Sequence, residues 1–116
     1  MEQQEKATAK NLPVRFSESA ISNIDEITGY IAFIKQAPLA AIKVGDGIFA
    51  TIEKINFNPW KYKECEQLRT KNHIYRITPY KSWHIIYKIK RTEILILGII
   101  HSSRKPSKLS TLRKIK

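Results

Sequence analysis

The amino-acid sequence predicts an α+β fold in which an N-terminal strand and an α-helical hairpin pack on a small antiparallel β-sheet, in the order β-α-α-β-β-β. Isoleucine recurs at helical spacing in two neighbouring segments of the first half, and three strand-like apolar runs follow one another between residues 74 and 100. A chain of 116 residues suits a single domain. We expect a flexible lead-in over residues 1–12, the folded domain over 13–106 and a basic tail over 107–116.

The first half is expected to contain a short strand at 13–16 and two helices. Ser17 supplies a side-chain oxygen that can cap a helix N-terminus, and this helix should run to Lys35. Pro38 then suits the first turn of a second helix, which should end at the Asn-Pro pair at 58–59. Each helix carries an apolar stripe, Ile21, Ile24, Ile27, Ile31 and Ile34 in the first and Ala41, Val44, Ile48, Ile52 and Ile55 in the second.

The second half is expected to contain an exposed polar loop followed by a meander of three strands. The loop covers residues 60–72 and has Leu68 as its only aliphatic anchor. Strands are expected at 74–79, 83–89 and 93–100, with short turns between them. The last strand contains the run ILILGII, which is typical of a central strand buried on both faces. The tail beyond it is basic and weakly helical at best.

Positive charge is concentrated in the second half of the chain. The formal net charge is +11 at pH 7, yet residues 1–58 hold 6 Lys and Arg against 7 Asp and Glu, whereas residues 59–116 hold 15 against 3. Charge of one sign on this scale indicates a polyanionic partner, either nucleic acid or an acidic protein. The alternative is that the basic side chains only solvate the outer face of the sheet, although solvated faces usually mix both signs.

The cysteine content and the hydropathy pattern exclude several classes of protein. Cys65 is the only cysteine, so no internal disulfide can form, and no Cys/His spacing resembles a zinc site. We expect neither a metal nor a cofactor. No apolar run reaches the roughly 18 residues that a membrane span needs, and the N-terminus lacks the apolar centre of a secretory signal. The expected location is a reducing cytoplasm, without membrane contact.

Five short motifs occur in a recognisable order. They are V-x-F-S-x-x-A at 14–20, Asn-Pro at 58–59, IYRI at 74–77, WHIIYKI at 83–89 and ILGIIHxxR at 96–104. Over residues 13–106 their order and spacing resemble the RelE/ParE superfamily of toxins from type II toxin–antitoxin modules. The resemblance implies a small basic toxin that a cognate antitoxin neutralises. It also implies one of two targets, because RelE-like members cut messenger RNA on the ribosome without a metal ion, whereas ParE-like members poison DNA gyrase.

Four residues of the basic half have the chemistry needed to cleave RNA without a metal ion. This reaction needs a base for the 2′-hydroxyl, cations to stabilise the phosphorane and an acid for the leaving oxygen. The candidate catalytic residues are Arg76, His84, His101 and Arg104. Because alternate residues of a strand share a face, Arg76 and His84 could lie on the same side of two neighbouring strands. The candidate substrate-binding residues are basic or aromatic, namely Arg69, Lys71, Lys81, Trp83, Tyr87 and Lys105.

Several of these residues also have a structural interpretation. His84 can fill a polar face of the sheet, and His101 can simply end its strand. Trp83 can be buried between the sheet and the hairpin. Tyr87 is expected mainly in the core, with its hydroxyl group reaching the surface.

The sequence leaves three functions open. Nucleases of the superfamily commonly carry an arginine where this chain has His84, and the tyrosine near the end of some of them has no counterpart in this tail. The first hypothesis is a toxin that acts as a ribosome-dependent, metal-free messenger RNA endoribonuclease, with a ParE-type gyrase inhibitor as the alternative. The third is a non-toxic basic module that binds nucleic acid or protein. The expected partners are a cognate antitoxin and either the ribosome with its messenger RNA or DNA gyrase.

Overall fold

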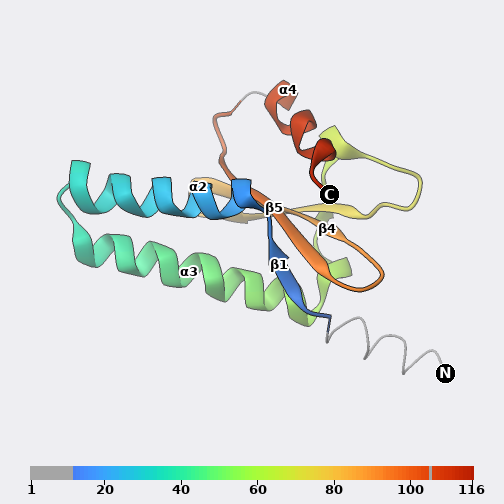
Figure 1. Ribbon diagram of the computed structural model, residues 1–116, viewed down its shortest axis with the longest axis horizontal. Coiled ribbons are helices and arrows are strands. Elements are labelled where there is room, and N and C mark those ends of the chain that lie inside the picture. The colour runs from blue at the N-terminus through green and yellow to red at the C-terminus, as the bar shows by residue number, and fades with distance from the viewer. Residues whose placement is uncertain (1–11, 105) are drawn as a thin grey trace.

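The computed structural model describes residues 12–104 and 106–116, and Figure 1 shows their arrangement. Its helices are α2 (Glu18–Gly29), α3 (Pro38–Phe57) and α4 (Pro106–Leu109), and its strands are β1 (Val14–Phe16), β2 (Lys63–Glu64), β3 (Tyr75–Tyr80), β4 (Trp83–Ile89) and β5 (Ile94–His101). A π-helical turn, Tyr30–Ile34, extends α2, and 3₁₀ turns are formed by Pro59–Lys61, Glu66–Leu68 and Ser110–Lys114. The predicted order of a strand, two helices and a meander is confirmed. Most of the expected lead-in, residues 1–11, lies outside the described residues.

The sheet has five strands in the order β1-β5-β4-β3-β2. Strands β3, β4 and β5 form the predicted antiparallel meander. Strand β1 pairs with β5 in parallel and β2 adds to the free edge of β3, so the whole sheet is mixed rather than antiparallel. Because β5 lies between two strands, residues 94–99 are all buried, which confirms the interior position predicted from the apolar run.

The helical hairpin packs on one face of the sheet, which we call the hairpin face. Ser17 caps α2 as predicted, since its Oγ accepts a hydrogen bond from the Ala20 N–H at 3.0 Å. The same hydroxyl donates to the Leu97 carbonyl oxygen at 2.9 Å and so fastens the start of α2 to β5. The apolar stripe predicted for α3 is buried along its whole length.

The stripe predicted for the first helix is only partly buried. Ile24, Ile27 and Ile31 pack against the core, whereas Ile21 and Ile34 are exposed. The hairpin projects beyond the sheet in Figure 1, so the end of its first helix, where Ile34 lies, has no strand packed against it. The π-helical turn at this end also rotates the side chains that would continue the stripe.

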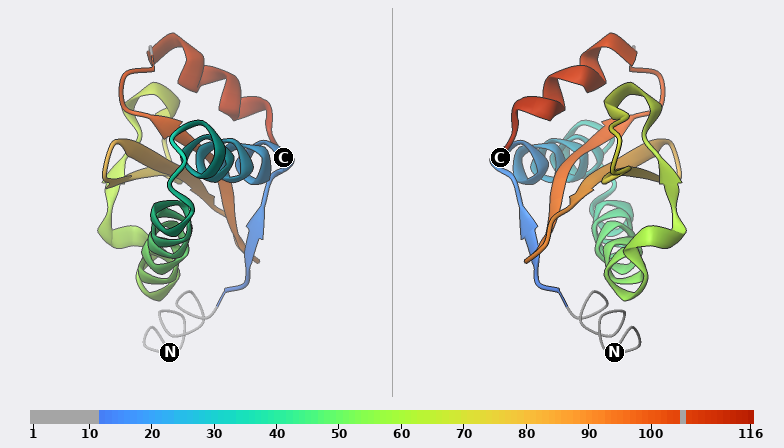
Figure 2. Two further views of the ribbon diagram at one scale, coloured as in Figure 1. Left: turned by 90° about the vertical axis from the view of Figure 1, so that its left-hand side faces the viewer. Right: turned by 90° about the vertical axis from the view of Figure 1, so that its right-hand side faces the viewer.

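The C-terminal segment covers the other face of the sheet, which we call the tail face. Leu109 and Leu112 are buried there in one cluster with Leu95 and Leu97 of β5. Figure 2 shows α3 and this segment on opposite sides of the sheet. The tail, for which the sequence predicts little structure, therefore folds into short helical turns because two leucines three residues apart give it an apolar side. No helix within the described ranges is long and apolar enough to cross a membrane.

Candidate functional site

A pocket on the tail face brings together three of the four predicted catalytic residues. Its volume is about 410 Å³, and it lies between the segment around β2, the middle of β3 and β4, the end of β5 and the tail. His84, His101 and Arg104 line it, with Lys63 and Glu64 on the opposite wall. We call it the histidine pocket.

The two histidines that border the histidine pocket lie on neighbouring strands, but the register places His101 opposite Trp83, so its side chain leaves the sheet on the face opposite to that of His84. His84 lies in β4 opposite Ile100 of β5 and is partly buried. His101 ends β5, and its ring meets the Trp83 ring edge-on with centroids 6.1 Å apart. The His101 Nδ1 accepts a hydrogen bond from the Ser103 N–H at 3.1 Å. A neutral His101 therefore carries its proton on Nε2, which leaves that atom as the donor.

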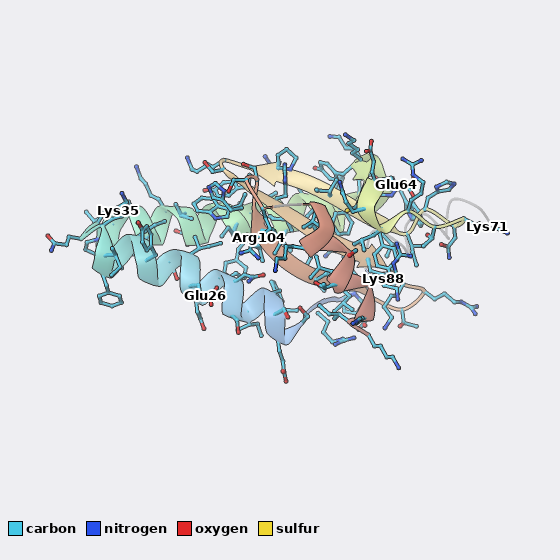
Figure 3. All side chains as sticks on the ribbon, turned by 90° about the horizontal axis from the view of Figure 1, so that it is seen from above. Glu26, Lys35, Glu64, Lys71, Lys88 and Arg104 are labelled. Atoms are coloured by element: carbon cyan, nitrogen blue, oxygen red, sulfur yellow. The ribbon has the colours of Figure 1, made fainter. Side chains whose placement is uncertain are left out.

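Arg104 follows β5 in the loop that leads to α4. Its backbone N–H donates to the His101 carbonyl oxygen at 2.9 Å, which turns the chain back over the end of the strand. Its side chain is exposed, and within residues 12–104 and 106–116 no hydrogen bond or ion pair holds the guanidinium. Figure 3 places Arg104 beside the tail, above the sheet. The side chain is thus available to an anion.

Arg76 does not join this group, and the expectation that it shares a face with His84 is wrong. In the β3–β4 register, Arg76 is opposite Tyr87, whereas Pro79 is opposite His84. Directly opposed residues share a face and successive residues alternate, so Arg76 and His84 point to opposite sides of the sheet. Arg76 lies on the hairpin face with Tyr87, and His84 lies on the tail face.

The guanidinium of Arg76 is occupied by the protein backbone. Its Nη1 donates to the Trp60 and Tyr62 carbonyl oxygens at 3.0 and 2.8 Å, and its Nε donates to the His73 carbonyl oxygen at 2.9 Å. The guanidinium also lies over the Trp60 ring, with Cζ 4.9 Å from the ring centroid. Arg76 thereby ties β3 to the segment that follows α3, and few of its donors remain for a phosphate.

The predicted substrate-binding residues are scattered rather than gathered around the histidine pocket. Tyr87 is fully buried, and its hydroxyl donates to the Pro59 carbonyl oxygen at 2.6 Å instead of reaching the surface. Burial raises the pKa of Tyr87 well above its usual value, so the hydroxyl remains protonated. Trp83 is partly buried against the hairpin-face core, as its structural interpretation predicted. Neither aromatic residue lines the pocket.

The basic members of this set lie in exposed turns. Lys81 occupies the β3–β4 turn with φ at 52° and lies over the Tyr80 ring. Arg69 lies 3.8 Å from Glu64, and Lys71 is exposed in the loop before β3. Lys105 is outside the described residues. These positions are compatible with long-range attraction of a polyanion but form no single binding site.

Glu64, which lines the histidine pocket, belongs to an ion-pair network that sequence reasoning missed. Glu64 Oε1 lies 3.0 Å from His73 Nδ1 and 3.8 Å from Arg69. Burial by itself raises the pKa of Glu64, but the hydrogen bond and charge of His73, with the charge of Arg69, outweigh it and hold the pKa below its usual value. No sequence signal marks this pair, because the segment between Glu64 and His73 has no periodicity.

The described residues contain no group of three or more His, Cys, Asp and Glu that could hold a metal ion. Among the described residues, the ion pairs of the basic half involve only Glu64 and Glu93 as acids. Most of its lysines and arginines thus remain without an acidic neighbour, which keeps this half of the molecule strongly positive.

A second candidate surface is an apolar groove along the helical hairpin, which sequence reasoning also missed. Its volume is about 710 Å³, and its walls include Phe33 of the first helix and Ile42 and Phe49 of α3. Phe33 is 79% exposed and Ile42 is 60% exposed. Asp25 and Asp46 lie among these side chains. A contiguous exposed apolar surface of this kind is typical of a protein-binding site.

Comparison with known proteins agrees with this architecture. A family model described as "ParE toxin of type II toxin-antitoxin system, parDE" matches residues 14–106. Among solved structures, "Chromosomal ParDE TA system from P. aeruginosa" is similar with a TM-score of 0.62, and the match covers 79% of this chain and 97% of that chain. Its sequence identity of 17% supports likeness of fold alone. No curated protein is similar enough in sequence to count as a match.

Proposed function

Because this chain belongs to the ParE toxin family of type II toxin–antitoxin systems, we propose that it acts by inhibiting DNA gyrase, as ParE-like members of the RelE/ParE superfamily do. The position of Arg76 supports this proposal over messenger RNA cleavage. A nuclease site needs several cations around the phosphorane, yet Arg76 lies on the hairpin face and bonds three backbone carbonyls. Arg76 therefore cannot join the cations around the histidine pocket that the nuclease mechanism needs.

Ribosome-dependent cleavage of messenger RNA is the second candidate function, and one observation favours it. His84, His101 and Arg104 all contribute to the lining of the histidine pocket. Two histidines can serve as base and acid, and Arg104 can stabilise an anionic transition state. This candidate makes the histidines essential to toxicity, whereas gyrase inhibition does not require their acid–base chemistry.

We propose that a cognate antitoxin neutralises the toxin and that part of the antitoxin occupies the apolar groove of the hairpin. Phe33, Ile42 and Phe49 offer the contiguous apolar surface that an amphipathic helix buries. Asp25 and Asp46 favour basic residues beside that apolar stripe. An acidic segment of the same antitoxin would match the basic half of the toxin. Both candidate targets place the toxin in the cytoplasm.

Expression of the toxin with and without its antitoxin tests these proposals. Gyrase inhibition predicts growth arrest, DNA-damage signalling and intact messenger RNA in cells, and loss of supercoiling by purified gyrase in vitro. The double variant His84→Ala/His101→Ala should remain toxic under this mechanism and lose toxicity if the toxin is a nuclease. Cleavage of messages within the ribosomal A site, with supercoiling unaffected, would replace gyrase inhibition with the nuclease. Unchanged growth would support the third possibility, a non-toxic binding module.

A further inference from the structure

The segment that joins α3 to β2 presents a tryptophan that neither the histidine pocket nor the apolar groove includes. Trp60 lies in the 3₁₀ turn Pro59–Lys61, and its side chain is 45% exposed. The Arg76 guanidinium covers part of its ring at 4.9 Å. The Trp60 ring is therefore open to solvent in part and contacts the Arg76 cation.

Side chains of the sheet hold the backbone of this turn in place through hydrogen bonds. Arg76 Nη1 donates to the Trp60 and Tyr62 carbonyl oxygens, and the buried Tyr87 hydroxyl donates to the Pro59 carbonyl oxygen at 2.6 Å. Pro59 is itself buried. With the backbone fixed and the Arg76 guanidinium against the ring, the Trp60 side chain has less conformational entropy to lose when a ligand stacks on it, so binding costs less.

Positive charge surrounds the same turn. The Lys61 ammonium lies 5.6 Å from the Tyr62 ring centroid, and both residues line a pocket of about 410 Å³ with Lys54 from the last turn of α3. Glu53 is the one acidic residue among the groups that line this pocket. We call Trp60, Arg76, Lys61 and Tyr62 together the Trp60 platform. It combines the exposed Trp60 ring and the half-buried Tyr62 ring with cations, and aromatic rings among cations are typical of proteins that bind single strands.

We propose that the Trp60 platform binds single-stranded nucleic acid, with a base stacked on Trp60 and the neighbouring phosphates near Lys61 and Lys54. Stacking tolerates any sequence because every base has a π-face. A paired base inside a duplex has no free face, so the platform should prefer single strands. The charge of the chain's second half selects a polyanion over a cationic protein segment. This activity goes beyond gyrase inhibition and does not depend on it.

Fluorescence anisotropy with the full chain and a labelled thymidine oligonucleotide of about 12 nucleotides, compared with a duplex of the same length, tests the proposal. We expect tighter binding of the single strand and weaker binding as salt rises. Trp60→Ala should weaken binding of the single strand about tenfold, and Trp60→Phe should retain most of the affinity because a phenyl ring still stacks. Lys61→Gln should lower the slope of log affinity against log salt by about 0.7.

The hairpin supplies matched controls. Tyr30 is an exposed aromatic residue with the Lys35 ammonium 5.9 Å from its ring centroid, so this pair resembles the platform in composition. Lys35 lies at the far end of the hairpin in Figure 3. Tyr30→Ala and Lys35→Gln should bind like the wild type. Circular dichroism establishes that each variant is folded.

Three results would each overturn the proposal that the Trp60 platform binds single-stranded nucleic acid. They are wild-type affinity in Trp60→Ala, equal affinity for single strand and duplex, and an equal loss in Tyr30→Ala. Because the assay contains no gyrase, its failure leaves gyrase inhibition standing. Failure of gyrase inhibition likewise leaves the platform standing.

Discussion

Arg76 and His84 lie on neighbouring strands, yet their side chains point to opposite faces of the sheet. Arg76 belongs to the hairpin face, where it bonds the carbonyl oxygens of Trp60, Tyr62 and His73. His84 belongs to the tail face, where it lines the histidine pocket. The register therefore separates Arg76 from His84, and the three hydrogen bonds to backbone carbonyl oxygens give Arg76 a structural role.

The first prediction concerns this structural role of Arg76. Arg76→Ala removes three hydrogen bonds to backbone carbonyl oxygens and the stacking on Trp60. We expect the free energy of unfolding to fall by about 2 to 4 kcal/mol, because hydrogen bonds from charged groups contribute about 1.5 to 3 kcal/mol each and do not add fully. Urea denaturation measures it. Arg104→Ala, which removes an exposed arginine, should change it by less than about 0.5 kcal/mol, and equal losses in both would contradict the structural role.

The second prediction concerns Gly47 of α3, on which the Tyr80 phenol packs. A Cβ at this position would overlap the Tyr80 hydroxyl and ring. Gly47→Ala should therefore lower the free energy of unfolding by about 1 to 3 kcal/mol through overpacking. Gly45→Ala is the matched control, because the nearest atom to its Cβ would be Thr28 Cγ2 at an ordinary 3.6 Å. This variant should gain up to about 1 kcal/mol from helix propensity. Stabilisation by both substitutions would show that Tyr80 moves aside freely.

The third prediction concerns stability at acid pH. Arg15 donates to Glu93 at 2.8 Å, and this hydrogen bonding is the main reason why the pKa of Glu93 is held below its usual 4.5, with Lys90 adding to it. A carboxylate with a depressed pKa stabilises the fold above the unfolded pKa, and this contribution is lost as the pH falls through the folded value. Glu93→Gln should therefore reduce the fall in Tm between about pH 6 and pH 3.

Glu26→Gln is the control for this pH dependence, since Glu26 is an exposed residue of α2, on the hairpin in Figure 3. It should leave the acid limb of the Tm curve close to that of the wild type. An acid limb in Glu93→Gln as steep as in the wild type would exclude the Arg15–Glu93 pair as a source of the pH dependence.

The fourth prediction concerns the tail. Leu112 is buried on the tail face with Leu95 and Leu97. Leu112→Ala should lower the free energy of unfolding by about 2 to 4 kcal/mol, through lost burial and the cavity left behind. Leu39→Ala changes the same residue type at a position that is 77% exposed and should cost less than about 0.5 kcal/mol. Chemical denaturation measures both variants. Equal denaturation midpoints for Leu112→Ala and Leu39→Ala would contradict the packing of the tail on the sheet.

The fifth prediction concerns the apolar groove. Ile42→Asp places a carboxylate in the exposed groove between Phe33 and Phe49, beside Asp46. We expect antitoxin binding to weaken by at least about 100-fold, since a buried unpaired charge at an interface costs several kcal/mol, with little change in stability. Calorimetric titration with the antitoxin measures the affinity. Lys43→Asp, on an exposed neighbouring position, is the charge control, and a similar loss there would point to general electrostatics instead of the groove.

The sequence by itself determined the local elements of this protein. Ser17, Pro38 and the Asn58-Pro59 pair set the ends of the two helices, and the apolar run of β5 marked an interior strand, because caps, prolines and periodicity act within a few residues. It also placed Arg104 only three residues beyond His101, the last residue of β5.

Only the tertiary structure decided which of these residues face each other. A shift of one residue in the pairing of β3 with β4 would move Arg76 to the face of His84, and no local signal fixes that register. The parallel pairing of β1, the packing of Leu112 and the contact of Arg76 with Trp60 likewise join residues far apart in the chain. Such contacts depend on how whole elements pack, because the free energy of burial is shared across the sheet and is not carried by any single segment.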